Sequence, residues 1–264
     1  MSQDRGKGAA IQASCLWYRY PDGRLAVEDV SFTLEEGKSL GIIGPNGAGK
    51  TTLLHVLAGL FPPESGDVLL LGKRLDPKNH SDLRRHLGIV FQETEDQLFS
   101  PTVFDDVAFG PLNFGVPLGQ VRGRVEEALA RVGLSGYEPR VPHHLSSGER
   151  RRAALATVLS YGPDVLVLDE PSSDLDPRGR RELVQLLRAT HQARLVASHD
   201  FEFILRTCER VLLMDRGRVR ADGRAAEILC DNDLLSSHGL EVPLGLKGVK
   251  PEELRKILEG EERS

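Results

Sequence analysis

Apolar residues follow two rhythms along the chain, short continuous runs and longer stretches with helical spacing. The runs Ser39–Ile43 and Val165–Leu168 predict buried strands, and helical spacing follows at Lys50–Leu60 and Arg180–Ala189. Further short strands are expected at Val68–Leu71, Gly88–Phe91, Arg194–Ala197 and Val211–Met214. The alternation of strands and helices predicts an α/β fold with a largely parallel central sheet.

Two regions depart from this alternation. Near the start, Ala13–Tyr20 and Ala26–Leu34 are joined by the turn residues Pro21-Asp22-Gly23, which predicts an antiparallel hairpin. In the middle, Phe104–Val132 has helical spacing that Pro117 and Gly119 divide into two helices. No strand pattern is found nearby, so a helical lobe is expected at about residues 92–160.

The last stretch, 231–264, is less regular. Leu254, Ile257 and Leu258 form one apolar stripe if Pro251 begins a helix. This stripe either packs on its own domain or faces a partner as a dimerising helix, and the pattern does not choose between them.

Composition narrows the class of protein. The chain has 264 residues, and its apolar runs are far shorter than the roughly 20 residues of a membrane span. Its net charge of −5 argues against nucleic acid as a partner, with Arg150–Arg152 interpreted as a solvated helix face. The cysteines Cys15, Cys208 and Cys230 lie far apart, which favours reduced thiols in the cytosol.

Residues 44–51 match the phosphate-binding P-loop pattern between an apolar strand and a helix. Its glycines let backbone N–H groups converge on phosphate oxygens, at the positive end of a helix. Lys50 would neutralise phosphate charge, and the Thr51 hydroxyl would ligate Mg²⁺. The predicted ATP-binding residues here are Gly44, Pro45, Asn46, Gly47, Ala48, Gly49, Lys50, Thr51 and Thr52.

Two carboxylates complement the P-loop. Asp169 and Glu170 follow the strand Val165–Leu168, at the edge of a parallel sheet where ligands bind. Asp169 is expected to hold Mg²⁺ directly or through water, and Glu170 to polarise the attacking water.

The segment Ser146-Ser147-Gly148-Glu149 precedes a helical run, so by itself it is a helix N-cap. Together with the other motifs it resembles the signature sequence of ABC ATPases. Ser147 stands where that family commonly has glycine, and Glu149 where glutamine is frequent.

The resemblance extends over nearly the whole chain. It implies that Tyr20, with Tyr18 as a rival, stacks on adenine, that Gln92 links Mg²⁺ and water to the helical lobe, and that His199 contacts the γ-phosphate. Ser173–Asp176 resembles the D-loop that crosses between subunits. The implied fold is a P-loop NTPase with a RecA-like parallel sheet core, an N-terminal antiparallel β subdomain and an inserted helical subdomain. It would span residues 11–240, followed by an extension at 241–264.

The resemblance also implies a mechanism. Two subunits, here expected to be a homodimer, would close head to tail on two ATP molecules. Ser146 and Gly148 of one chain would cap the γ-phosphate held at Lys50 of the other, where a helix N-terminus favours negative charge. Hydrolysis would reopen the dimer.

The region Gln92–Asn113 looks like the ATPases of energy-coupling-factor importers, and most like their cobalt and nickel branch because of the ending Phe109–Asn113. In that family this region faces a membrane scaffold subunit, while a separate membrane subunit binds the cargo. The chain would then lie on the cytoplasmic face of the cell membrane, and Mg²⁺ would be its own metal. A vitamin-type cargo remains an alternative.

Other classes of protein are considered beside this one. A GTPase would need a guanine-reading Asn-Lys-x-Asp segment, which the chain lacks, and a small-molecule kinase would not need the signature, D-loop and histidine in this order. A soluble ABC ATPase acting on DNA or ribosomes usually carries long coiled coils or a second ATPase domain, and no sustained heptads occur here. A nucleotide binder without turnover is the remaining alternative.

Overall fold

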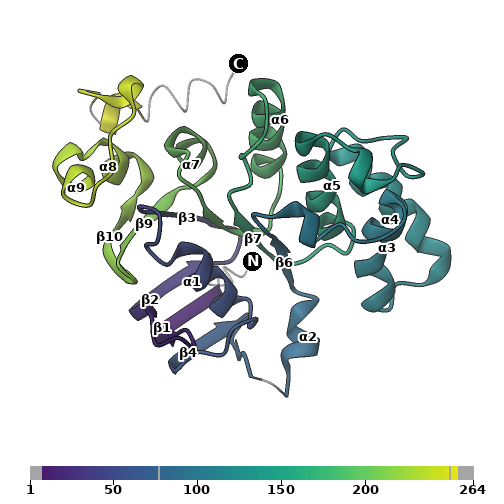
Figure 1. Ribbon diagram of the computed structural model, residues 1–264, viewed down its shortest axis with the longest axis horizontal. Coiled ribbons are helices and arrows are strands. Elements are labelled where there is room, and N and C mark those ends of the chain that lie inside the picture. Colours follow the sequence, from purple (N-terminus) through teal and green to yellow (C-terminus); the bar gives the residue numbers. More distant parts are fainter. Residues whose placement is uncertain (1–7, 77, 250, 255–264) are drawn as a thin grey trace, which may run out of the picture. The chain divides into compact units, whose positions relative to one another are not determined.

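The computed structural model describes residues 8–76, 78–249 and 251–254 (Figure 1). The chain divides into two compact units. The first combines residues up to 78 with those from 193 onward, and the second spans 79–192.

The first unit contains an antiparallel sheet with the strand order β2-β1-β4-β5. The predicted hairpin is confirmed, because β1 (Ala9–Arg19) pairs antiparallel with β2 (Leu25–Glu35). β4 (Ser65–Leu70) pairs with β1 on its other side, and the short β5 (Lys73–Arg74) pairs with β4.

A second set of strands in this unit surrounds β3 (Ser39–Ile43), which is buried along its whole length. β3 pairs in parallel with β8 (Ala193–Ala197) and with β9 (Arg210–Asp215). β10 (Arg218–Arg224), which the sequence pattern does not predict, extends this set antiparallel to β9. The sheet core is therefore parallel, as expected, with an antiparallel strand at its edge.

The helix α1 (Lys50–Leu57) follows β3 and ends three residues before the predicted Leu60. Gly59 adopts a left-handed φ of 67°, and the N–H of Leu60 donates to the carbonyl of His55 at 2.9 Å. Such a glycine-centred C-cap stops the helix before its apolar pattern runs out.

The unit continues with the short helices α7 (Phe201–Thr207), α8 (Ala225–Cys230) and α9 (Asn232–Ser237), and a 3₁₀ turn η3 (Leu244–Leu246). Leu254 is buried. Ile257 and Leu258 lie outside the described residues, so the apolar stripe near the C-terminus stays a prediction.

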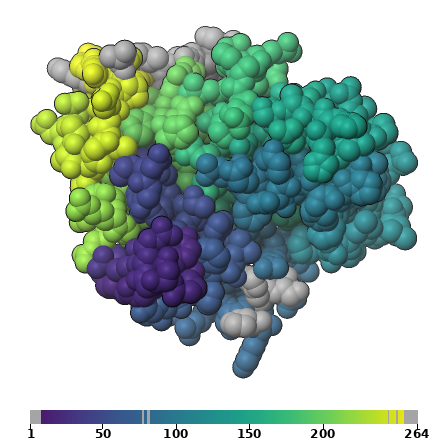
Figure 2. Space-filling model, viewed as in Figure 1, coloured from purple at the N-terminus to yellow at the C-terminus, as the bar shows by residue number. Residues whose placement is uncertain are grey.

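The second unit contains two parallel strands, β6 (Leu87–Val90) and β7 (Val165–Asp169). Between them along the chain come three helices that pack against one another, α3 (Val103–Asn113), α4 (Leu118–Arg131) and α5 (Ser147–Leu159). The teal region of Figure 2 shows these helices as one continuous surface. The predicted break between two helices near Pro117 is confirmed. The remaining elements are α2 (His80–Arg84), α6 (Pro177–Arg188) and the 3₁₀ turns η1 (Thr94–Asp96) and η2 (Pro142–His144).

Within the described ranges, no helix combines the length and the apolar character needed to cross a bilayer. All three cysteines are free thiols, with Cys15 exposed and Cys208 buried. Burial raises the pKa of Cys208 to about 12, so this thiol stays protonated and unreactive near neutral pH.

Candidate nucleotide-binding and hydrolysis residues

The P-loop connects β3 to α1 through glycines that no other residue could replace without strain. Gly49 has φ +99°, and a Cβ there would lie 2.2 Å from the carbonyl oxygen of Ala26. Gly44 is equally confined, since a Cβ would lie 2.1 Å from the carbonyl oxygen of Met214. The loop is thus held close to the neighbouring backbone at Ala26 and Met214.

Lys50 begins α1, and its ammonium lies across this loop. Its Nζ donates to the carbonyl of Gly44 at 2.8 Å and to that of Pro45 at 3.1 Å. An ammonium group carries three donors and no acceptor, so it suits the phosphate oxygens that a P-loop encloses. Thr51 follows on the first turn of the helix and is half-buried.

The two candidate adenine-stacking tyrosines differ in accessibility. The ring of Tyr18 is buried and stacks on Phe61, with the centroids 5.2 Å apart and the planes at 11°. Tyr20 is half-buried, and its hydroxyl shares a 2.8 Å hydrogen bond with the Thr52 hydroxyl beside the P-loop. A stacking role is therefore better supported for Tyr20 than for Tyr18, and it stays a prediction.

His199 lies in the loop between β8 and α7. Its side chain is exposed, whereas the preceding Ser198 is fully buried. Ser198 Oγ accepts a hydrogen bond from the N–H of Asp200 at 3.1 Å, and Asp200 in turn caps α7 by accepting from the N–H of Phe203. These contacts fix the backbone on both sides of His199 and leave its imidazole at the surface.

In the second unit, Asp169 is the last residue of the fully buried strand β7, and Glu170 follows it. Both side chains are themselves buried, at 4% and 8% exposure. Glu170 adopts a left-handed φ of 47°, a conformation that costs energy for a residue with a Cβ. Strained backbone of this kind persists only where its surroundings hold it.

Gln92 lies two residues after the end of β6 and is exposed. The loop that carries it is pinned by Gln97, a residue that the sequence analysis does not identify. Gln97 Oε1 accepts from the N–H of Phe91 at 3.3 Å, and its Nε2 donates to Ala154 O and Thr157 Oγ1 on α5 at 3.0 and 2.9 Å. The Gln92 loop is thereby attached to the helix that carries the signature sequence.

Ser146 caps the N-terminus of α5 in a capping box with Glu149. Glu149 Oε2 accepts from the N–H and from the hydroxyl of Ser146, both at 2.8 Å, while its Oε1 accepts from the Tyr137 hydroxyl at 2.6 Å. These donors, with Tyr137 contributing most, lower the pKa of Glu149 to about 2. The second signature residue, Gly148, is half-buried on the first turn.

The capping box predicts a pH-dependent contribution to stability. Because the folded-state pKa of Glu149 lies below its ordinary value of 4.5, its stabilisation is present above pH 4.5 and is lost as the pH falls toward 2. Glu149→Gln should lower the free energy of unfolding at pH 7 by about 1 kcal/mol, after allowance for solvent screening at this partly exposed site. Urea denaturation should show this difference shrinking between pH 4.5 and pH 3.

The matched control is Glu127→Gln, which removes an exposed carboxylate from α4. Its effect should stay within about 0.5 kcal/mol at each pH, as for most surface substitutions. A Glu149→Gln difference that stayed constant with pH would show that the ionised carboxylate is not what stabilises the cap.

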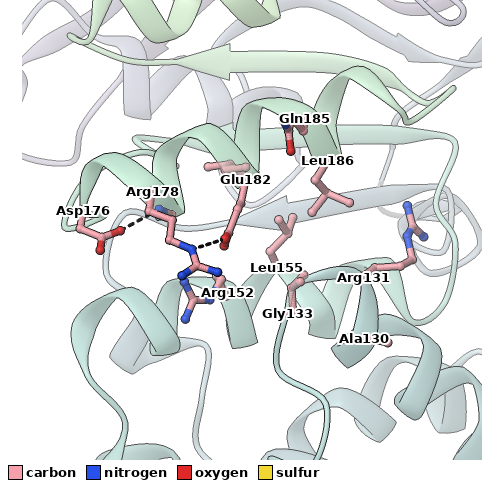
Figure 3. Close-up of a pocket in the computed structure, with 13 residues that line it drawn as sticks. Ala130, Arg131, Gly133, Arg152, Leu155, Asp176, Arg178, Glu182, Gln185 and Leu186 are labelled. Carbon is pink, nitrogen blue, oxygen red and sulfur yellow. Dashed lines mark hydrogen bonds and ion pairs between the residues drawn. The ribbon is translucent and has the colours of Figure 1, made fainter.

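A separate cavity of about 620 Å³ lies in the second unit between α4, α5 and α6 (Figure 3). Arg152 and Leu155 of α5 line it together with residues of α6, among them Arg178 and Glu182, whose side chains form a 2.8 Å ion pair. Of the D-loop, it includes Asp176, the N-cap of α6. No residue predicted to bind nucleotide or Mg²⁺ lines this cavity, so its position does not identify the nucleotide site.

Comparison with known proteins agrees with the motif order. The family model for ABC transporters matches residues 27–173. A putative ABC transporter ATP-binding protein of Streptomyces coelicolor is 46% identical over 237 residues, covering 90% of this chain and 91% of its own. An energy-coupling factor transporter ATP-binding protein, EcfA, of Methanothermobacter thermautotrophicus is 42% identical over 238 residues, covering 88% of this chain and 76% of its own.

Solved structures give the same result for the fold. CbiO1 from Clostridium perfringens, part of the ABC transporter complex CbiONQ, superposes with a TM-score of 0.77 at 32% identity, covering 97% of this chain and 100% of its own. A bacterial ABC transporter cassette solved as a dimer gives 0.75 at 26% identity, covering 81% of this chain and 98% of its own. The predicted P-loop NTPase fold, with its antiparallel β subdomain, is confirmed. The chain belongs to the ABC transporter family, as one of the ATPases whose ATP hydrolysis is coupled to transport.

Proposed function

We propose that this ATPase powers a membrane importer of the energy-coupling-factor class, with cobalt or nickel as the cargo. Its similarity to EcfA and to CbiO1 supports the class of transporter. The choice of cargo rests on the segment Phe109–Asn113 and its resemblance to the cobalt and nickel branch. The chain would act at the cytoplasmic face of the cell membrane.

ATP would bind with its phosphates on the P-loop and its adenine on Tyr20. Mg²⁺ prefers hard oxygen ligands and takes several of them from phosphate and water. The Thr51 hydroxyl, the Asp169 carboxylate and the Gln92 amide oxygen are donors of this kind and would hold it. Bound there, Mg²⁺ would neutralise charge on the β- and γ-phosphate oxygens.

Glu170 is proposed to orient and polarise the attacking water, and His199 to contact the γ-phosphate. A carboxylate fixed at a strand end by a constrained backbone suits general-base work, because its position is set before substrate arrives. Ser146 and Gly148 of a second copy of the chain would complete the site from the opposite side. A head-to-tail homodimer with two active sites follows from this arrangement.

The observation that best supports binding to a membrane partner is an exposed aromatic pair in the Gln92–Asn113 region. Phe99 and Phe109 are 62% and 50% exposed, and their rings meet edge to face with the centroids 5.2 Å apart. Leu112, one turn beyond Phe109 on α3, is also exposed. Large apolar side chains grouped at a surface are typical of a site that binds another protein.

Phe99, Phe109 and Leu112 together form what we call the aromatic surface. The loop that carries Phe99 is held in place by a buried side chain. The buried carboxylate of Asp106 accepts hydrogen bonds from the N–H groups of Phe99 and Ser100 at 3.1 and 2.9 Å. Burial raises the pKa of Asp106, while the hydrogen bonds from Ser100 and Phe99 oppose this shift. A loop ordered in this way would lose less backbone entropy when Phe99 binds a partner.

Co-purification of the tagged protein from its native membranes tests the proposal. Wild-type protein should carry with it a scaffold subunit and a small cargo-binding membrane subunit, which mass spectrometry would identify. A cargo subunit that binds a vitamin would overturn the metal cargo alone. Recovery only with ribosomes, DNA or itself would overturn the transporter role.

The double variant Phe99→Ser/Phe109→Ser should lose the scaffold subunit while keeping ATP hydrolysis. Losing an aromatic anchor costs about 2 kcal/mol or more of binding free energy, roughly thirtyfold in affinity. Leu118→Ser is the matched control, because Leu118 is 80% exposed but lies outside this region. Equal recovery from both variants would show that the aromatic surface does not bind the scaffold.

A further inference from the structure

Arg151 is a buried arginine on α5, only 5% exposed, in the turn after the signature sequence. Its Nη1 donates to the carbonyl of Phe91 at 2.9 Å, and its Nη2 donates to the hydroxyl of Ser173 at 2.6 Å. Nη2 also lies 3.6 Å from a carboxylate oxygen of Asp174. One guanidinium therefore joins the loop after β6 to the loop after β7.

Two of these contacts lead to a residue with a proposed role in hydrolysis. Phe91 immediately precedes Gln92, so its carbonyl is part of the peptide that carries Gln92. Ser173 Oγ donates to the carbonyl oxygen of Glu170 at 2.8 Å. Arg151 thus reaches the backbone of Gln92 directly and the backbone of Glu170 through one hydroxyl group.

The loop that follows β7 needs such an anchor. Glu170 and Asp174 adopt left-handed φ values of 47° and 63°, although both carry a Cβ. Each such residue stores strain that surrounding contacts must offset. The contacts of Arg151 fall on Ser173 and Asp174, at the far end of the same strained segment.

The burial of this guanidinium is itself costly. Burial lowers the pKa of Arg151, although the nearby carboxylates of Asp174, Glu93 and Glu95 act to raise it. Its Nε is buried and finds no hydrogen-bond partner within the described part of the chain. Replacing buried ion pairs by apolar side chains is often neutral or stabilising, so stability alone is a weak reason for a buried arginine.

We propose that Arg151 is a positioning residue for ATP hydrolysis, which sets the backbone of Gln92 and of Glu170 relative to each other. The proposal rests on the roles proposed above for those two residues. A lysine could keep the charge near Asp174, but its single point of donation cannot reproduce the planar fork that spans Phe91 and Ser173. Arg151→Lys is therefore the informative change, because it retains the charge and removes the geometry.

The experiment measures kcat and KM for ATP in Arg151→Lys, Ser173→Ala and the double variant, with kcat expressed per ATP-binding-competent molecule. Arg151→Lys should lower kcat by about tenfold to a hundredfold, part of the effect of a misplaced general base, with KM within about twofold. Ser173→Ala should act in the same direction. The double variant should match Arg151→Lys within about twofold, because both changes break one network.

Arg178→Met is the control for loss of an arginine from the same unit, since Arg178 pairs with Glu182 at the surface of the cavity in Figure 3. Its kcat should equal the wild-type value. The inference is overturned if Arg151→Lys keeps wild-type kcat per competent molecule, or if the losses in the double variant multiply. Full turnover in Glu170→Gln would instead overturn the role of Glu170, so the two failures can be told apart.

Discussion

Replacing Glu170 by glutamine is expected to reduce steady ATP turnover to background while nucleotide binding stays intact. The side chain lies at the end of a fully buried strand and is itself buried, and glutamine fits its space. The substitution removes only the negatively charged carboxylate oxygen that would accept a hydrogen bond from the attacking water and polarise it. A positioned general base contributes about 10²–10⁴ in rate, so the residual activity should fall below one per cent.

Phosphate release and the binding of labelled ATP, measured on the same preparations, separate the two effects. Glu182→Gln provides the control, because it removes an exposed carboxylate on α6 in the same unit. Unchanged turnover in Glu170→Gln would remove Glu170 from the mechanism. Lost ATP binding would instead assign it a structural role.

Gly49→Ala should abolish ATP binding and lower the melting temperature. The new Cβ would lie 2.2 Å from the carbonyl oxygen of Ala26, at a φ of +99° that disfavours any L residue. Left-handed strain and overpacking together cost roughly 2–4 kcal/mol of folding free energy. In a chain of this size the melting temperature should fall by roughly 5–10 °C.

Gly72→Ala is the control that separates the effect of backbone strain from the effect of a steric clash of the new Cβ. Gly72 has a similar left-handed φ of +74°, but a Cβ there would meet no atom within 4 Å. It should cost only about 1–2 kcal/mol and leave ATP binding unchanged. If Gly49→Ala had the same melting temperature as Gly72→Ala and bound ATP normally, the close approach of the P-loop to β2 would not constrain the site.

Sequence reasoning succeeded where the determinants are local. The P-loop, the strand before Asp169 and the cap at Ser146 each depend on neighbouring residues, and their elements appear within a few residues of the expected positions. The limits of α1 were less predictable, because the C-cap at Gly59 ends the helix while the apolar pattern continues. Strand β10 was missed because charged residues such as Arg218 and Asp222 alternate along it at the sheet edge.

The contacts that hold the candidate site could not be predicted from the sequence, for a different reason. Gln97 reaches Ala154 and Thr157 across 57 and 60 residues of chain, and Arg151 reaches Phe91 across 60. No local spacing encodes such pairs. In the sequence Arg151 belongs to a run of three arginines that resembles a solvated face, whereas the fold buries it.

The amide clamp of Gln97 has a mechanical consequence. Gln97 is pinned to α5 and to Phe91, while Phe99 lies only two residues further along the chain, beyond the buried Leu98. The chain between the aromatic surface and Gln92 is therefore short and held at Gln97, so it has little freedom to absorb a displacement. If the proposed partner moved against Phe99, this short segment would pass the displacement on to the backbone of Gln92 while the loop stayed folded.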